Sequence, residues 1–410
     1  MTQVKQLDNV DVKVGNDSVS IRTFSLSVNS VTVEVSNMGA SITKLLVPNF
    51  GPKQHGIADD VVLGYKSAVD TYLSTNPTYM AVVVGRVANR IARGNFSVDG
   101  RNYIVATNNG PNHLHGGVNG FSHRIWDAKI IDGSMVQFTL VSQDGDQGYP
   151  GTVQVAATYS LVAKGEKGAT LKLEMGGKHL SGNASPINLA QHTYFNLAGH
   201  NHATGILDHK LTMPSEAYTP VDSTSIPTRE VRSLDNDVAM DWRSGRLVRD
   251  ALVEFGTLKA GLLASQVQSH FTISRCAPEL ATAGADCPNP NEPYGFDHNY
   301  VVFKDEHDTL SLVGTVEHAD SGRRLTVLTD APGVQLYTAN WLDGSNSEIC
   351  KDGSAYGQWQ GLCLETQSYP DGIVEIDAEF PEFARGKCFI LRPGGPDYKH
   401  RVEYHFEPLS

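Results

Sequence analysis

Apolar and polar residues alternate with a period of two along much of this 410-residue chain. The pattern is clearest in residues 31–35, 153–161, 171–175 and 402–406. Successive side chains of a β-strand point to opposite faces of a sheet, so each segment is predicted to be a strand with one face in a core. Asp-Gly pairs at 99–100, 132–133, 144–145 and 352–353 are turn signals. Together these features predict an all-β fold, a large antiparallel β-sandwich.

The best candidate for a helix is residues 245–263, where apolar residues recur at steps of three and four. Asp241 or Ser244 is expected to cap its start. The residues that follow, 276–293, are rich in Ala, Pro, Asn and Gly, which is typical of a loop. Because no linker divides the chain, we expect a single domain over residues 1–410 with few short helices.

The net charge is −12, from 33 basic and 45 acidic residues. It disfavours nucleic acid and membrane as partners, because both require clustered positive charge. No apolar run is long enough for a membrane-spanning helix, and residues 1–6 do not resemble a secretory signal. Five cysteines without a CxxC motif are typical of free thiols in a reducing compartment, so we expect a cytoplasmic protein. Pairing of Cys276 with Cys287 under oxidation is the less favoured alternative.

Two regions are candidates for binding and chemistry. Residues 85–92 and 112–117 combine Asn, Arg and His with glycines, and 364–367 contain an isolated carboxylate. Such a set favours a neutral, hydroxyl-rich ligand. On a strand His113 and His115 would share a face and could form a metal pair, although a third ligand is not recognisable. The glycines after them favour close approach of the backbone to a ligand, with a tight structural turn as the alternative.

Three further residues have two interpretations each. His192 lies among apolar and aromatic residues and is either a core histidine or a general acid. Asp297 precedes a predicted strand and either caps a turn or accepts hydrogen bonds from sugar hydroxyls. Glu365 is either the buried partner of an arginine or a base with a raised pKa. The residues alone leave these alternatives open.

Motifs of other enzyme classes are absent from the sequence. It contains neither a GxxxxGK[ST] phosphate loop nor a GxSxG nucleophile elbow. The glycines at 116–120 do not follow the strand-then-helix pattern of a dinucleotide site.

Taken together, these segments resemble the aldose 1-epimerase (galactose mutarotase) family. The resemblance spans most of the chain and follows the order of segments in that family. It rests on residues 37–42, 60–65, 85–92, 109–117, 148–151, 192–197, 295–299, 332–338 and the segment around Glu365. Any one of these segments would be a weak signal, whereas nine in the same order are specific.

The resemblance implies a large antiparallel β-sandwich with an open sugar cleft and neither metal nor cofactor. By position, Glu365 matches the general base of the family and His192 its general acid. The residues that match its sugar-binding side chains are Asn89, Arg90, His115, Asp297 and Gln335. In the family the counterpart of His115 contacts the sugar near its ring oxygen, and His113 is expected to be structural support.

The implied activity is the interconversion of α and β anomers of free hexoses, such as galactose and glucose, by general acid/base ring opening and closure. A carboxylate such as Asp297 or Glu365 near His192 is expected to favour the imidazolium form and so keep the acid loaded. The alternatives are a hexose-6-phosphate 1-epimerase and a non-catalytic sugar-binding or sensing protein. We expect a monosaccharide as the small-molecule partner, and a monomer or homodimer.

One region departs from the family pattern. The connection that precedes Asp297 is longer than usual, and residues 256–293 are interpreted as an insertion. It either lies at the edge of the cleft and alters specificity or is a tolerated surface loop. We favour the surface loop, because lengthening a loop costs little entropy.

Overall fold

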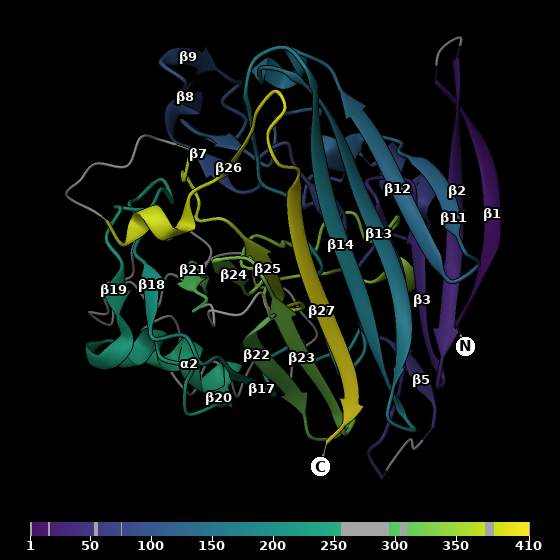
Figure 1. The fold of residues 1–410 in the computed structure, drawn as a ribbon. Helices are drawn as coiled ribbons and strands as arrows, with labels where there is room; N and C mark the ends of the chain where they lie inside the picture. The colour runs from purple at the N-terminus through teal and green to yellow at the C-terminus, as the bar shows by residue number, and fades with distance from the viewer. Residues whose placement is uncertain are drawn as a thin grey trace.

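The computed structural model describes residues 2–14, 17–52, 56–74, 76–255, 295–303, 310–373 and 381–409. The regular structure within these ranges is mostly antiparallel β-strand, which confirms the predicted fold class (Figure 1). The largest sheet has nine strands in the order β11-β12-β13-β14-β27-β23-β22-β17-β20. Their bounds are β11 Asp127–Ile131, β12 Met135–Ser142, β13 Thr152–Lys164, β14 Gly168–Ser181, β17 His209–Thr212, β20 Arg246–Leu247, β22 Ser311–His318, β23 Arg323–Thr329 and β27 Tyr398–Pro408.

Two five-stranded sheets accompany the large one. The first has the order β1-β2-β3-β4-β5 and the second β19-β18-β21-β24-β25. The strands of the first are β1 Gln3–Val14, β2 Asp17–Val28, β3 Val31–Ser36, β4 Ser41–Pro48 and β5 Ala58–Asp60. Those of the second are β18 Ala217–Thr219, β19 Arg232–Ser233, β21 Asp297–Val301, β24 Gly333–Tyr337 and β25 Cys363–Gln367.

Short two-stranded ribbons connect these sheets and carry part of the candidate site. They pair β10 with β7, β16 with β6, β15 with β26, and β8 with β9. Their bounds are β6 Val83–Val84, β7 Arg90–Ile91, β8 Asn95–Val98, β9 Arg101–Ile104, β10 His113–Leu114, β15 Ser185–Ile187, β16 Ala190–Gln191 and β26 Phe389–Leu391.

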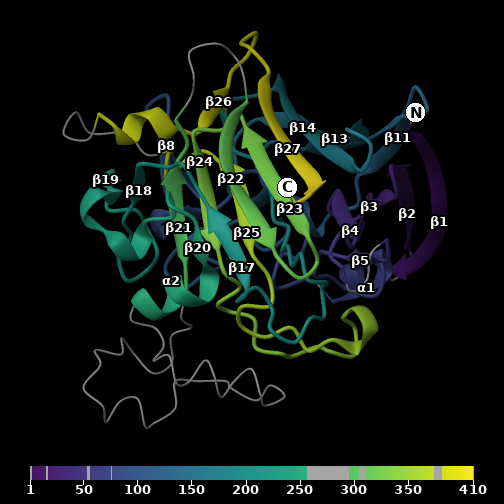
Figure 2. The same cartoon turned by 90° about the horizontal axis from the view of Figure 1, so that it is seen from below.

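One hydrophobic cluster contains buried side chains from all three large sheets. Val33 contributes from the first five-stranded sheet, Val155 and Tyr404 from the nine-stranded sheet, and Val334 and Leu364 from the second five-stranded sheet. Both five-stranded sheets therefore pack against the nine-stranded sheet, and Figure 2 shows them at opposite ends of it. This packing gives β24 and β25 a buried, rigid position for the side chains described below.

The alternating segments predicted from the sequence lie in β3, β13, β14 and β27, with their apolar residues buried. The Asp-Gly pair at 99–100 joins β8 to β9, the pair at 132–133 joins β11 to β12, and 144–145 lies between β12 and β13. The pair at 352–353 differs, because it lies in a 3₁₀ turn, Lys351–Gly353, within the long connection between β24 and β25. Alternation and turn residues are local signals, which is why they located these strands.

The helices are short. The α-helices within the described ranges are α1 (Ala68–Leu73) and α2 (Val248–Glu254). The capping prediction for α2 was wrong: its N-cap is Leu247, which makes no side-chain capping bond, because the strand β20 leads directly into the helix. The predicted insertion at 256–293, including Cys276 and Cys287, lies outside the described residues. No helix within the described ranges has the length and apolar character needed to cross a membrane.

Candidate active site

Three adjacent strands present polar side chains on one face of the second five-stranded sheet. Glu365 lies in the middle of β25, and Gln335 is its direct partner on β24. Asp297 is the first residue of β21 and pairs with Tyr337, also on β24. Cross-strand partners and alternate residues of one strand share a face, so all four side chains point to the same side of the sheet.

Two histidines approach this face from neighbouring loops. His192 follows β16, and its backbone is held by Ala81 and Val82 through hydrogen bonds of 2.8 and 2.9 Å. His115 follows β10 and is tied to Asn89 twice. Its N–H donates to the Asn89 carbonyl at 3.1 Å, and the Asn89 N–H donates to His115 Nδ1 at 3.1 Å. The two imidazole rings lie 5.3 Å apart, centroid to centroid.

His113 and His115 do not share a face, because the backbone turns sharply between them. β10 ends at Leu114, and His115 has a left-handed φ of 49°. His113 is fully buried, with Nδ1 2.6 Å from the Ala106 carbonyl oxygen and Nε2 2.7 Å from the Tyr149 hydroxyl. Both of its ring nitrogens are therefore occupied by the protein, as structural support requires.

The glycines after His115 support a tight structural turn rather than close approach of the backbone to a ligand. Gly116 has a φ of 83°, and a Cβ there would lie 1.8 Å from the carbonyl oxygen of Gly85. The close approach is thus to the backbone of the chain itself, and it fixes the loop that carries His115 against the segment before Asn89.

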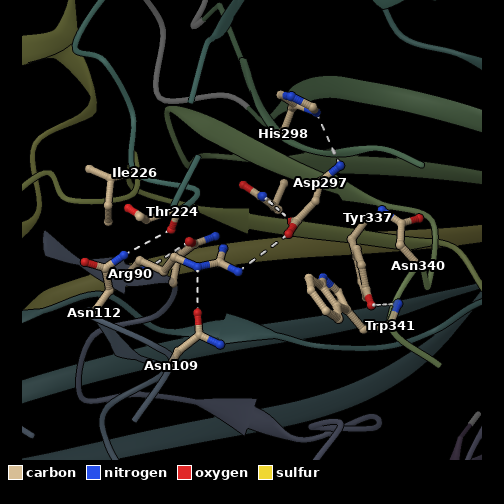
Figure 3. Close-up of polar contacts among 12 residues, drawn as sticks. Arg90, Asn109, Asn112, Thr224, Ile226, Asp297, His298, Tyr337, Asn340 and Trp341 are labelled. Atoms are coloured by element: carbon tan, nitrogen blue, oxygen red, sulfur yellow. Dashed lines mark hydrogen bonds and ion pairs between the residues drawn. The ribbon is translucent and has the colours of Figure 1, made fainter. Parts of the chain in front are cut away.

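Arg90, the first residue of β7, reaches across the site to Asp297 of β21 (Figure 3). Its Nε donates to Asn109 Oδ1 at 3.1 Å, and its terminal nitrogen lies 3.7 Å from an Asp297 carboxylate oxygen. The amide of Gln335 donates to the other oxygen of that carboxylate at 2.6 Å. The Arg90 N–H is bonded to Asn89 Oδ1 at 2.9 Å. These contacts fix an alternating array of donors and acceptors, which suits sugar hydroxyls.

All seven residues singled out from the sequence line one cleft of about 580 Å³: Asn89, Arg90, His115, His192, Asp297, Gln335 and Glu365. Sequence reasoning missed the aromatic part of its wall, formed by Tyr79, Tyr194, Tyr337 and Trp341. Tyr194 and Tyr337 lie within segments that carry the family resemblance, so they had a signal. Tyr79 and Trp341 lie in irregular loops and had none.

His192 and Glu365 form the pair best suited to proton transfer. His192 Nε2 lies 3.5 Å from Glu365 Oε1, and the two residues are 5 % and 2 % exposed. Glu365 Oε2 is buried and has no hydrogen-bond partner in the described structure. Burial, reinforced by Asp297, holds the pKa of Glu365 well above its ordinary value, and Arg90 opposes this shift. Such a carboxylate is a base of raised strength.

The expected imidazolium form of His192 is contradicted by its surroundings. Burial lowers the pKa of His192 to about 4, and this outweighs the opposing effect of Asp297. The desolvation cost of a charged ring exceeds the attraction of the nearby carboxylate, so the ring is neutral near pH 7. Sequence inspection identified the carboxylates but not the burial.

His115, His192 and Glu365 also have the atoms of a metal site, since one ligand atom from each lies within 4.8 Å of the others. The tautomer of His115 opposes this use. Its Nδ1 accepts the Asn89 N–H, so the neutral ring carries its proton on Nε2, the nitrogen left for the cleft. Metal-bound histidines instead donate their second N–H outward. His115 is therefore a hydrogen-bond donor towards the cleft.

Comparison with known proteins places these residues in context. The family model described as aldose 1-epimerase matches residues 22–404. The galactose mutarotase of Rattus norvegicus is 36% identical over 387 residues, which are 94% of each chain. The galactose mutarotase of Homo sapiens is 36% identical over 389 residues, 94% of each chain. The aldose 1-epimerase of Escherichia coli is 28% identical over 391 residues, 95% of this chain and 96% of that one.

Solved structures show the same fold. A GalM/aldose epimerase homologue from C. elegans superposes with a TM-score of 0.72 at 25% identity, covering 93% of this chain and 97% of that chain. A galactose 1-epimerase from Lactobacillus acidophilus superposes with a TM-score of 0.69 at 22% identity, covering 100% of this chain and 99% of that chain. The likeness extends over nearly the full length in both cases.

Proposed function

Because the chain belongs to the aldose 1-epimerase family, we propose that it interconverts the α and β anomers of free hexoses, with Glu365 as general base and His192 as general acid. The observation that carries the assignment of roles is the 3.5 Å contact between His192 Nε2 and Glu365 Oε1 inside the cleft. A donor and an acceptor at this separation can reach the C1 hydroxyl and the ring oxygen of one pyranose.

The reaction requires two coupled proton transfers. Glu365 takes the proton of the C1 hydroxyl, the bond between C1 and the ring oxygen breaks, and C1 becomes a carbonyl carbon. The ring oxygen receives the proton from His192 Nε2. Rotation about the C1–C2 bond then presents the other face of the carbonyl, and the same transfers in reverse close the ring as the other anomer. General acid and base together typically accelerate such a step by about 10²–10⁴-fold.

The remaining polar residues of the cleft are proposed to hold the sugar. His115 offers Nε2–H as a donor near the ring oxygen, and Arg90 offers donors to hydroxyls. Asp297 accepts from hydroxyls in an orientation fixed by Gln335. Arg90 is the sole Lys or Arg among the cleft-lining residues, counted within the described ranges, and Asp297 already neutralises it. This balance favours a neutral hexose over a hexose 6-phosphate.

Polarimetry of freshly dissolved α-D-galactose and α-D-glucose tests the activity. We expect the protein to accelerate the decay of optical rotation, with much less effect on α-D-glucose 6-phosphate. His192→Ala should remove nearly all of the acceleration while the thermal unfolding temperature stays close to that of the parent protein. An active, folded His192→Ala variant would exclude His192 as the acid. A folded parent protein that binds galactose without accelerating mutarotation would instead support the sugar-sensing alternative.

A further inference from the structure

An aromatic ring covers both histidines of the cleft from one side. The Tyr79 ring lies 4.6 Å from the His115 ring, edge to face, and 6.1 Å from the His192 ring, nearly parallel to it. With the 5.3 Å contact between the histidines, the three rings form a closed triangle. Tyr79 is half-buried and lines the same cleft as the two histidines.

The loop that carries Tyr79 holds an unfavourable backbone conformation. Asn76, Tyr79 and Ala81 have φ values of 38°, 54° and 59°. The left-handed region is tolerated by asparagine but disfavoured for a bulky aromatic residue. Strain of this kind persists only where the surroundings fix it, and it is concentrated at functional sites.

Several bonds fix this loop on the two sides of Tyr79. The side chain of Asn76 accepts from the Met80 N–H at 2.8 Å and donates to the Met80 carbonyl at 3.2 Å. The Tyr194 hydroxyl donates to the Thr78 carbonyl at 2.8 Å. The loop is thus tied to the segment after β16 that carries His192, and the position of the Tyr79 ring follows from these anchors.

We propose that Tyr79 is a positioning residue whose ring holds His115 and His192 in place and excludes water from them. The role of the ring in turnover rests on the proposed function, whereas its effect on the histidines does not. The contacts of Tyr79 with both histidines are made by its ring, so we expect phenylalanine at this position to fulfil the same role.

The causes of the pKa shifts of the two histidines are consistent with a ring that excludes water. Burial is the largest cause that lowers the pKa of both histidines. Asp297 raises the pKa of His192, and Arg90, His113 and His192 lower that of His115. The other titratable groups that face His192 are Glu365, His115, Cys363, Tyr194 and Tyr337, and Glu365 also lies close to His115.

Replacement of Tyr79 removes none of these groups from the chain. Loss of its ring admits water and should therefore raise the pKa of both histidines towards the value of an exposed imidazole. Burial also raises the pKa of the Tyr79 phenol, so Tyr79 contributes an uncharged ring.

The test compares Tyr79→Ala with Tyr79→Phe in the full chain labelled with [¹³Cε1]-histidine. NMR titration gives the pKa of His115 and His192, which are assigned by their own substitution. We expect Tyr79→Phe to match the parent protein, and Tyr79→Ala to raise both pKa values by about one unit or more. Polarimetry should show that Tyr79→Ala lowers kcat by about tenfold or more at pH 7, with a smaller change in KM, because misplacement of catalytic groups acts on the chemical step.

Tyr103 supplies the matched control. It is also half-buried and stacks on one ring, that of Phe96, at 5.5 Å in a separate hydrophobic cluster. Tyr103→Ala should lower stability without moving either histidine pKa. Tyr79→Asn, which removes the ring and is tolerated at the left-handed φ of 54°, is the second variant in case the alanine variant does not fold.

Two results would overturn the proposal. Unchanged histidine titrations in Tyr79→Ala or Tyr79→Asn would show that the ring does not keep the histidines dry. A loss in Tyr79→Phe as large as in Tyr79→Ala would assign the effect to the hydroxyl. The titrations need no substrate, so they remain decisive even if the parent protein does not accelerate mutarotation.

Discussion

Replacement of Glu365 by glutamine separates catalysis from stability. Glutamine keeps the shape of the side chain but cannot take the C1 hydroxyl proton. The acceleration lost is expected to be about 10²–10⁴-fold, which corresponds to about 3–5 kcal/mol in the activation free energy. Polarimetry with α-D-galactose, after subtraction of the spontaneous rate, measures this loss in kcat/KM. Retention of more than about a tenth of the activity would refute the role of Glu365 as base.

The same substitution should not destabilise the fold. The pKa of Glu365 is raised in the folded state, so above pH 4.5 the folded chain keeps a proton that the unfolded chain has released. The stability of the parent protein therefore falls as pH rises through this window, and glutamine removes that penalty. We expect the unfolding temperature of Glu365→Gln to exceed that of the parent protein at pH 8, with a smaller difference near pH 4.5.

Glu403 provides a control of opposite sign. Burial raises its pKa, but hydrogen bonds from His405 and Lys172 outweigh burial, and the net pKa is lowered. A lowered pKa stabilises the fold above the unfolded value and loses this effect as pH falls. Glu403→Gln should therefore lower the unfolding temperature at pH 8 and have little effect at low pH. If both glutamine variants shift stability in the same direction, the argument from their surroundings is wrong.

Three further outcomes are expected. Asp297→Asn should raise KM for galactose by about tenfold or more, measured by polarimetry, because it weakens the contacts with Arg90 and Gln335 and removes an acceptor from the cleft. Dialysis against a chelator should leave kcat unchanged; a large loss restored by zinc would establish a metal role for His115. Burial and His202 lower the pKa of His318 to about 4, so between pH 6.5 and 4 the unfolded chain binds more protons than the folded chain. Stability therefore decreases as pH decreases from 6.5 to 4. His318→Gln should make the unfolding temperature less dependent on pH in this range.

Local sequence patterns predicted much of the fold but not how distant segments meet. Alternation and Asp-Gly turns located strands such as β13 and β14, because side-chain direction and turn chemistry are set by neighbouring residues. Residue types drew attention to several site residues, including His192 and Glu365, and the family resemblance completed the set of seven and gave them roles. All seven line one cleft, although His192 and Glu365 are far apart in the chain. Their roles remain predictions.

What the sequence could not supply depends on tertiary structure. His113 and His115 separate because His115 takes a left-handed φ, which no pattern around it signals. The neutral state of His192 comes from burial by residues of several elements, and this outweighs the carboxylates that the sequence places nearby. Tyr79 was missed because its loop has no periodicity, and its contacts to the histidines exist only in the folded chain.

In the proposed mechanism His192 and Glu365 share one proton, and the position of this proton decides whether the pair can react. Burial favours a carboxylic acid beside a neutral imidazole. The proposed ring opening starts instead from a carboxylate beside a protonated Nε2. These states contain the same number of protons and differ by one transfer across the 3.5 Å contact. Solvent pH therefore does not set the balance between them, but the charges of Arg90 and Asp297 and the bound sugar do.

This shared proton predicts a broad pH profile. The value of kcat should be nearly constant as pH rises from about 5 through the range in which an exposed histidine titrates, because burial lowers the pKa of His192 and raises that of Glu365, so that the pair holds one proton there. It should fall towards pH 4, where His192 takes up a second proton and no base remains. A narrow bell centred near the pKa of an exposed histidine, measured by polarimetry at saturating galactose, would show that the two groups titrate independently. In that case His192 would act as a solvated acid, and the burial of the pair would not explain its chemistry.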